Sequence, residues 1–328
     1  MFKAQRLAAC SAILLWSCLG DVPHENPLDP GSELFVSTGS LRGQVTTFYQ
    51  PYRPVRGVML ELWPSNLTTI SDTAGFFAIR NAPAGEYLLY ARHKNYAGDS
   101  TRVVIQQETP ARVSFLLDAL PQIRRVKGRT FHVNNLPPED DVDFALFEVV
   151  VDDPDGPADV ASVLMQISGI NKIDTLRETS QAGVYNLELF GTDLGNGRLQ
   201  SILGREISFT AVDRLGKRPE PEKLILFRII DHAPEVSSPK DRTTADSTRP
   251  LLRWKPFSAA FAFSYSVRVE RIVAGIPALV WERNNIESAL ASVRVDKALA
   301  NVEHRWTVSV TDEFGNTSTS EPAAFLLP

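Results

Sequence analysis

From Ser40 to Phe325 the chain is a succession of short runs rich in Val, Ile, Thr, Phe and Tyr, each ended by Pro, Gly, Asn or Asp. Runs of this length and composition are typical of β-strands, and the residues between them are typical of turns. The 22 Pro and 19 Gly are spread along the chain instead of being gathered in one tract. The hydrophobic fraction of 43 % is enough for packed cores. We therefore predict an all-β protein of tandem β-sandwich domains.

Both cysteines, Cys10 and Cys18, lie near the N-terminus, and the rest of the chain has none. The predicted domains therefore have no disulfides, thiol catalysis or cysteine zinc sites, and core burial alone must stabilise them. The formal net charge is −5, with no cluster of Lys and Arg. Because phosphate binding needs such a cluster, nucleic acid is excluded as a partner.

The N-terminus has the order of an export signal. Residues 1–6 are basic, and Leu7 to Ser17 form an apolar run that is too short to span a bilayer. Leu15-Trp16-Ser17-Cys18 resembles the lipobox of bacterial lipoprotein signals. The resemblance implies a signal peptide over 1–17 and a lipidated Cys18. Because Leu19 follows in place of Asp, it also implies the outer membrane, on its periplasmic or cell-surface side.

Two alternatives to this anchor remain open. Leu7-Ala8-Ala9-Cys10 also has lipobox letters, although cleavage there would leave almost no apolar segment before it. The chain could also be a soluble secreted protein whose cysteines both lie in a discarded signal. Residues 18–36 are rich in Pro, Gly and acids without periodicity, which predicts a flexible tether between the lipidated cysteine and the first domain.

The first predicted domain covers residues 37–119. Strands are expected at 40–48, 55–63, 75–80, 87–93, 101–105 and 111–117. Its motifs are Gly43-Gln44-Val45, Val55-Arg56-Gly57-Val58-Met59-Leu60, Ser71-Asp72-Thr73-Ala74-Gly75-Phe76-Phe77 and Asn81-Ala82-Pro83-Ala84-Gly85-Glu86-Tyr87. In this order they resemble the carboxypeptidase-regulatory-like, transthyretin-like domains. The motif positions are structural, with Asp72 and Gly75 forming a turn into a core strand, and the resemblance implies no peptidase activity.

A loop of this domain carries the candidate ligand-binding residues Phe48, Tyr49 and Tyr52, to which Trp63 is added. Aromatic side chains beside Arg53 can form a stacking surface for sugar rings or a Pro-rich peptide. The alternative is that these rings cap the end of the sandwich.

The second predicted domain covers residues 120–232, with strands at 144–151, 160–167, 183–190, 205–212 and 223–230. An early Asp-rich turn and the late turn Asp213-Arg214-Leu215-Gly216 resemble those of immunoglobulin-like domains of bacterial surface proteins. The early turn supplies Asp152, Asp153, Asp155 and Asp159 as candidate calcium ligands. Their spacing does not fit an EF-hand, and a metal-free Asp-Gly turn is the alternative. No other cofactor is expected.

The third predicted domain covers residues 233–328. Its motifs are Pro250-Leu251-Leu252-Arg253-Trp254-Lys255-Pro256, Tyr265-Ser266-Val267-Arg268-Val269, His304-Arg305-Trp306-Thr307-Val308-Ser309-Val310 and the closing Asp312-Glu313-Phe314-Gly315. They resemble the fibronectin type III pattern, although His304 leads a strand that usually begins with an aromatic residue. The resemblance implies that Trp254 and Trp306 are buried, that 292–295 is a strand, and that Leu299 belongs to the core.

Motifs for catalysis are missing from the sequence. It contains no Gly-x-Ser-x-Gly, His-Glu-x-x-His, Walker or dinucleotide motif. The five histidines are dispersed, and His232-Ala233-Pro234-Glu235 is a poor zinc platform because Pro234 interrupts it. We expect no enzyme, but a membrane-anchored envelope scaffold, spacer or interaction module with other envelope proteins as partners. The alternative is a module that binds glycan or peptide through the aromatic loop.

Overall fold

The structure is a computed structural model, and it describes residues 31–32, 36–107, 109–195 and 197–328. The predicted signal peptide, Cys18 and most of the predicted tether lie outside these residues. The described part forms two compact units, one made of the described residues up to Lys94 with Gly98–Leu117, the other of Asn95–Ala97 with Asp118–Pro328. No helix within the described ranges is long and apolar enough to cross a membrane.

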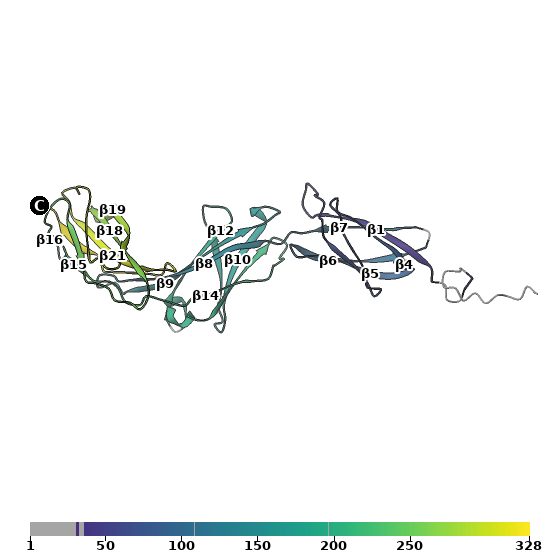
Figure 1. The fold of residues 1–328 in the computed structure, drawn as a ribbon, viewed down its shortest axis with the longest axis horizontal. Coiled ribbons are helices and arrows are strands. Elements are labelled where there is room, and N and C mark those ends of the chain that lie inside the picture. The colour runs from purple at the N-terminus through teal and green to yellow at the C-terminus, as the bar shows by residue number, and fades with distance from the viewer. Residues whose placement is uncertain (1–30, 33–35, 108, 196) are drawn as a thin grey trace, which may run out of the picture. The chain divides into compact units, whose positions relative to one another are not determined.

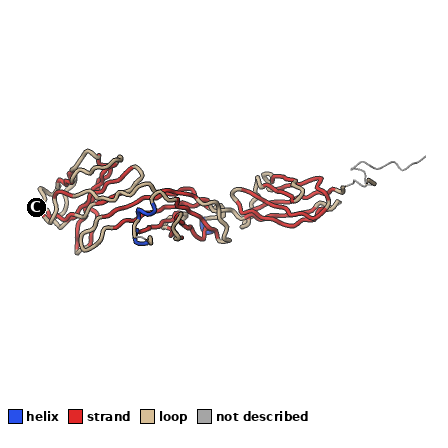
Figure 2. The backbone as a smooth tube through the Cα atoms, turned by 90° about the horizontal axis from the view of Figure 1, so that it is seen from below, coloured by secondary structure: helices blue, strands red, loops and turns tan. Residues whose placement is uncertain are grey.

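The prediction of an all-β protein is confirmed (Figures 1 and 2). The helical segments of the described residues are three 3-10 turns in the second unit, η1 (Pro157–Asp159), η2 (Gly191–Asp193) and η3 (Leu199–Ile202).

The first unit is a sandwich of two sheets, with strand orders β4-β1-β7 and β3-β2-β5-β6. Its strands are β1 (Thr38–Thr47), β2 (Met59–Trp63), β3 (Leu67–Ile70), β4 (Phe76–Pro83), β5 (Gly85–His93), β6 (Tyr96–Ile105) and β7 (Ala111–Leu117). Alternate residues of these strands point inward. Leu41, Leu60, Leu62, Leu89, Ile105, Phe115 and Leu117 are accordingly almost fully buried.

The predicted turn into a core strand is confirmed in this unit. Asp72 Oδ1 accepts the backbone N–H groups of Ala74 at 2.9 Å and Phe76 at 2.8 Å. Gly75 has φ +74°, and a Cβ there would lie 2.3 Å from the carbonyl oxygen of Val45. Only glycine fits this turn without displacing the neighbouring strand.

The second unit contains two further sandwiches. The strands of its first sandwich are β8 (Gln122–Val133), β9 (Val142–Asp152), β10 (Val160–Ile167), β11 (Ile173–Glu178), β12 (Val184–Phe190), β13 (Glu206–Asp213) and β14 (Glu222–Ile225). One layer has the order β14-β13-β10-β11 and the other β12-β9-β8, and β11 pairs with both β10 and β12. Phe147, Val163, Ile207 and Phe209 lie fully buried in its core. We call this sandwich the second sandwich.

The third sandwich completes this unit. Its strands are β15 (Val236–Ser238), β16 (Thr243–Thr244), β17 (Leu251–Trp254), β18 (Phe263–Val273), β19 (Ile276–Glu287), β20 (Ser292–Arg294), β21 (His304–Asp312), β22 (Thr317–Thr319) and β23 (Ala323–Leu326). Sheet β15-β17-β20 packs opposite β22-β21-β18-β19. The predicted burial of Trp254 and Trp306 is confirmed, at 3 % and 1 % exposure, and Leu299 belongs to the same core.

One sheet continues from the second sandwich into the third. Strand β8 pairs with β9 from Gln122↔Asp152 to Val133↔Val142, and its last residues pair in parallel with β22, from Thr317↔Phe131 to Thr319↔Val133. The linker between the two sandwiches, residues 226–230, is held at both ends, because Leu226 lies in the second core and Ile230 in the third. The two sandwiches are therefore joined by backbone pairing as well as by the linker.

Several strands have no clear signal in the sequence. The structure adds β3, β8, β11 and β19, which carry polar or charged residues on exposed faces and edges and so lack the alternation of a half-buried strand. Two predicted strands are too long. Residues 55–58 precede β2, and residues 226–230 cross between the sandwiches instead of extending β14. In residues 226–230 the apolar pattern arises because Leu226 is buried in the core of the second sandwich and Ile230 in that of the third.

Candidate functional site

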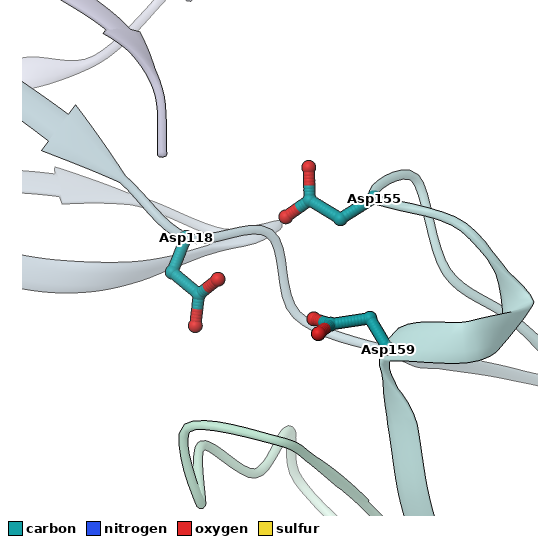
Figure 3. Close-up of side chains that lie close together, drawn as sticks. All are labelled: Asp118, Asp155 and Asp159. Atoms are coloured by element: carbon teal, nitrogen blue, oxygen red, sulfur yellow. The ribbon is translucent and has the colours of Figure 1, made fainter. Parts of the chain in front are cut away.

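Five aspartates gather at the end of the second sandwich where the chain enters it. Asp118 and Ala119 precede β8, Asp153, Asp155 and Asp159 lie between β9 and β10, and Asp213 ends β13. We call these five residues, Asp118, Asp153, Asp155, Asp159 and Asp213, the aspartate cluster. Figure 3 shows the carboxylates of Asp118, Asp155 and Asp159 turned toward a shared space.

The carboxylates of the cluster are close together and mostly buried. One oxygen each of Asp118, Asp155 and Asp159 lies within 4.8 Å of the others. Asp118, Asp153 and Asp159 are only 5–6 % exposed, and Asp213 is 1 % exposed. Carboxylates so near each other and so shielded from water repel strongly unless a positive charge compensates them.

Backbone amides hold some of the carboxylate oxygens in place. Asp153 Oδ1 accepts the N–H of Asp155 at 2.9 Å, and Asp155 Oδ2 accepts the N–H of Ala119 at 3.0 Å. Asp213 Oδ1 accepts the N–H of Lys217 at 2.7 Å. The side chains are therefore oriented by the loops that carry them.

Other oxygens of the cluster are buried without a hydrogen-bond donor among the described residues. They are both carboxylate oxygens of Asp118, Oδ2 of Asp153 and Oδ2 of Asp213. A buried polar atom left without a partner costs about 1–3 kcal/mol, and more when it is charged. Elsewhere among the described residues such atoms occur singly, at Asn134, Asp174, Asn186 and Trp254, whereas the cluster gathers four of them in one place, so they call for a ligand.

The electrostatics of the cluster agree with its geometry. Burial first, and then the negative charges of four neighbouring carboxylates, raise the pKa of Asp118 to about 7. In order of effect, these neighbours are Asp213, Asp159, Asp155 and Asp153. Burial also raises the pKa of Asp153 to about 6, although its bond from the Asp155 N–H acts in the opposite direction.

Three of the four predicted calcium ligands lie in the cluster, and the fourth does not. Asp152 is exposed, and its carboxylate lies 2.6 Å from the guanidinium of Arg124. The reason is strand alternation: Asp152 ends β9 with its side chain on the face opposite to that of Val151, which points into the core. The inclusion of Asp152 was therefore wrong.

Two members of the cluster, Asp118 and Asp213, are not among the predicted ligands. Asp213 lies in the Asp-x-x-Gly turn that the sequence shows, and it reaches the Asp-rich loop because it pairs with Val160, next to Asp159, between β10 and β13. Asp118 is separated from the others by more than thirty positions along the chain, and only the fold brings it to them. No local spacing could have indicated it.

The predicted aromatic residues do not form one flat surface. Phe48, Tyr52 and Trp63 are 39 %, 54 % and 56 % exposed. The rings of Phe48 and Tyr49 meet edge to face, with an interplanar angle of 84°. Trp63 ends β2, which belongs to the other sheet of the sandwich than β1.

The raised pKa values predict how pH changes the stability of the protein in a chelator. Between pH 4 and pH 7 the folded protein keeps a proton on Asp118 that the unfolded chain releases, so the free energy of unfolding falls as pH rises. We expect the melting temperature in EDTA to fall from pH 5 to pH 7 and to level off above. Asp118→Asn should flatten this slope, and an unchanged slope would contradict the assignment to Asp118.

The chain has only distant similarity to known proteins. No protein-family model and no curated protein sequence matches it. Among solved structures, a type II cohesin–X–dockerin complex from Acetivibrio cellulolyticus is 18 % identical over 25 % of this chain, with a TM-score of 0.21. The TIE protein of Bacillus anthracis is 11 % identical over 89 %, with a TM-score of 0.27. This chain covers 58 % and 49 % of those two chains.

A third similar structure contains the FN1–FN3 domains of chicken CNTN1, 8 % identical over 89 % of this chain and 96 % of that one, with a TM-score of 0.32. These likenesses are too distant to assign a function.

Proposed function

We propose that this protein is an exported, lipid-anchored envelope protein that acts as a non-catalytic scaffold or spacer. The observation that carries the proposal is the sheet shared by the second and third sandwiches. Because β8 pairs with β9 along its length and with β22 at its end, bending this joint would break backbone hydrogen bonds. A stiff pair of sandwiches suits a part that holds partners at a fixed separation.

Side chains reinforce the joint. Thr130 donates its backbone N–H to Asn316 Oδ1 at 2.9 Å, and Ser318 donates its hydroxyl to the carbonyl oxygen of His232 at 2.8 Å. Arg228, in the linker, lies 2.9 Å from the buried carboxylate of Asp312. Its guanidinium also lies over the ring of Phe261, at 4.3 Å from the centroid.

The settings of three described histidines, His132, His232 and His304, support a non-catalytic role. His132 pairs with Asp143 at 2.7 Å on the second sandwich, and His304 bonds the carbonyl oxygen of Val302 at 2.9 Å inside the third. His232 stacks on Phe257 beside the linker. Each has a separate structural setting, whereas acid–base catalysis needs such groups gathered around one substrate.

Spin labels on either side of the joint test its stiffness. Residues 36–328 contain no cysteine, so Ser180→Cys and Ser288→Cys, both at exposed positions, can be labelled specifically. We expect an interspin distance distribution about as narrow as that of a pair within the second sandwich, Ser180→Cys with Gln200→Cys. Arg228→Ala should broaden it, whereas Arg124→Ala, which removes an exposed ion pair, should not. A broad distribution in the parent chain would rule out a stiff spacer.

The anchor rests on Cys18 and the signal-like segment before it. We expect the mature protein to begin at a diacylated or triacylated Cys18 and to enter the detergent phase on phase separation, since several acyl chains bind membranes durably. Cys18→Ser should move the protein to the aqueous phase, and Cys10→Ser should not. A mature N-terminus beyond Cys18, or lipid on Cys10, would refute this anchor; both are visible by mass spectrometry.

A second candidate function is binding of a glycan or peptide by the first sandwich. It is supported by the exposure of Phe48 and Tyr52 on the loop after β1, beside the exposed Arg53. The perpendicular rings of Phe48 and Tyr49 favour an edge-lined pocket over a flat platform.

Glycan and peptide arrays probed with residues 36–328 test this candidate. If the loop binds, Tyr52→Ala should weaken the signal at least about tenfold, the usual effect of removing an aromatic anchor. Ile70→Ala, which removes an exposed apolar side chain of β3 outside the loop, is the matched control. Arrays without signal, or equal losses in the two variants, would reject binding by the loop.

A further inference from the structure

We propose that the aspartate cluster binds one calcium ion and that the ion closes the end of the second sandwich. The inference rests on an internal comparison of three turns and on buried carboxylate oxygens that lack donors. It is independent of the lipid anchor and of the scaffold role.

Each sandwich contains an Asp-x-x-Gly turn with the same hydrogen bonds. The turns begin at Asp72, Asp213 and Asp312. In each, the glycine N–H donates to the aspartate carbonyl oxygen, at 3.0, 3.1 and 3.1 Å. The N–H four residues after the aspartate donates to its Oδ1, at 2.8, 2.7 and 2.9 Å. The turns therefore differ mainly in the groups that contact the second carboxylate oxygen of the aspartate, Oδ2.

In two of these turns the negative charge of the aspartate is either solvated by water or paired with a cation. Asp72 is exposed, so water solvates its carboxylate. Asp312 is buried, and its Oδ2 accepts bonds from the Arg228 guanidinium at 2.9 Å and from the Asn316 side-chain amide at 3.0 Å. Arg228 belongs to the chain entering the third sandwich, so that sandwich brings its own cation to the turn.

The chain entering the second sandwich brings another carboxylate to the cluster that contains Asp213. Asp213 is as buried as Asp312, but its Oδ2 has no donor among the described residues. The carboxylate brought by the entering chain is that of Asp118, which is 5 % exposed and whose two oxygens also lack a donor among the described residues. The neighbours of Asp118 in the cluster are further carboxylates, with oxygens of Asp155 and Asp159 within 4.8 Å. Where the third sandwich has a guanidinium, the second therefore leaves a place for a cation.

The donor set fits calcium. Calcium takes six to eight oxygen ligands at about 2.3–2.6 Å, so oxygens on opposite sides of one ion lie up to about 5 Å apart. The oxygens of Asp118, Asp155 and Asp159 lie within 4.8 Å of one another, and Asp153 and Asp213 have buried oxygens to add. Magnesium prefers a stricter octahedron and keeps several waters, which a buried set of carboxylates does not favour.

Such an ion would join three segments that are distant in the sequence. They are the entering chain at Asp118, the loop between β9 and β10, and the turn after β13. Each segment is oriented by backbone hydrogen bonds, so the ion meets a largely preformed site and adds little ordering cost. We therefore expect calcium binding to raise the stability of the second sandwich against unfolding.

The melting temperature of the full-length protein at pH 8 is measured in EDTA, in millimolar CaCl2 and in millimolar MgCl2. A site that calcium occupies in the folded state only should raise the melting temperature by about 5–10 °C relative to EDTA. Magnesium should give less than half of this shift. Isothermal titration with CaCl2 should show one site per chain.

Variants separate a calcium ligand from a merely structural residue. Asp118→Asn should weaken calcium binding at least tenfold and reduce the calcium shift, yet in EDTA it should melt above the parent because it removes a repelling charge. Asp213→Asn should behave alike, since an amide oxygen can still accept the Lys217 N–H. Asp152→Asn, next to the cluster in sequence but outside it, should leave both values unchanged.

Several results would overturn the proposal. One is a parent protein with the same melting temperature in EDTA and CaCl2 and no heat on titration. Another is an equal shift from magnesium, which would remove the assignment to calcium. A third is an Asp118→Asn variant that melts below the parent in EDTA as much as in calcium, because that would make Asp118 a structural residue only.

Discussion

The second and third sandwiches depend on the backbone ladder of β8. This strand is long enough to complete one layer of the second sandwich and then pair with β22 of the third. Its sequence, with Arg124, Arg125, Lys127 and Arg129, places charged side chains on the exposed face, so it pairs through its backbone while contributing few residues to either core. Leu226 and Ile230 hold the ends of the linker in the two cores, and Arg228 between them pairs with Asp312.

Charge balance where the chain enters each sandwich of the second unit is the other organising constraint. A buried aspartate at the end of a core strand orders the following turn by accepting its N–H groups, but its negative charge must also be compensated. The third sandwich does this with Arg228. In the second sandwich the entering chain supplies Asp118, so the acidic residues around the turn form a cluster. The same Asp-x-x-Gly turn therefore contains a buried ion pair in the third sandwich and forms part of a candidate cation site in the second.

Much of the architecture was predictable because short β-rich runs and turn residues are local signals. The core strands β1, β5, β7, β10 and β13 agree with expectation, as do the buried Trp254 and Trp306. Edge strands with one face in solvent, such as β19, are hard to predict, because their many polar residues obscure the alternation of apolar and polar positions. For the candidate site, the acidic loop was visible in the sequence, but Asp152 was included wrongly and Asp118 was missed.

The sequence by itself determined the all-β class, the turns and the supply of acidic residues, because these follow from the properties of neighbouring residues. Tertiary structure alone decided which carboxylates meet, since a strand places successive side chains on opposite faces and only strand pairing brings Asp118 and Asp213 to the loop at Asp153. It also decided that the second and third sandwiches share a sheet, because backbone pairing between β8 and β22 depends on no side-chain pattern that a sequence displays.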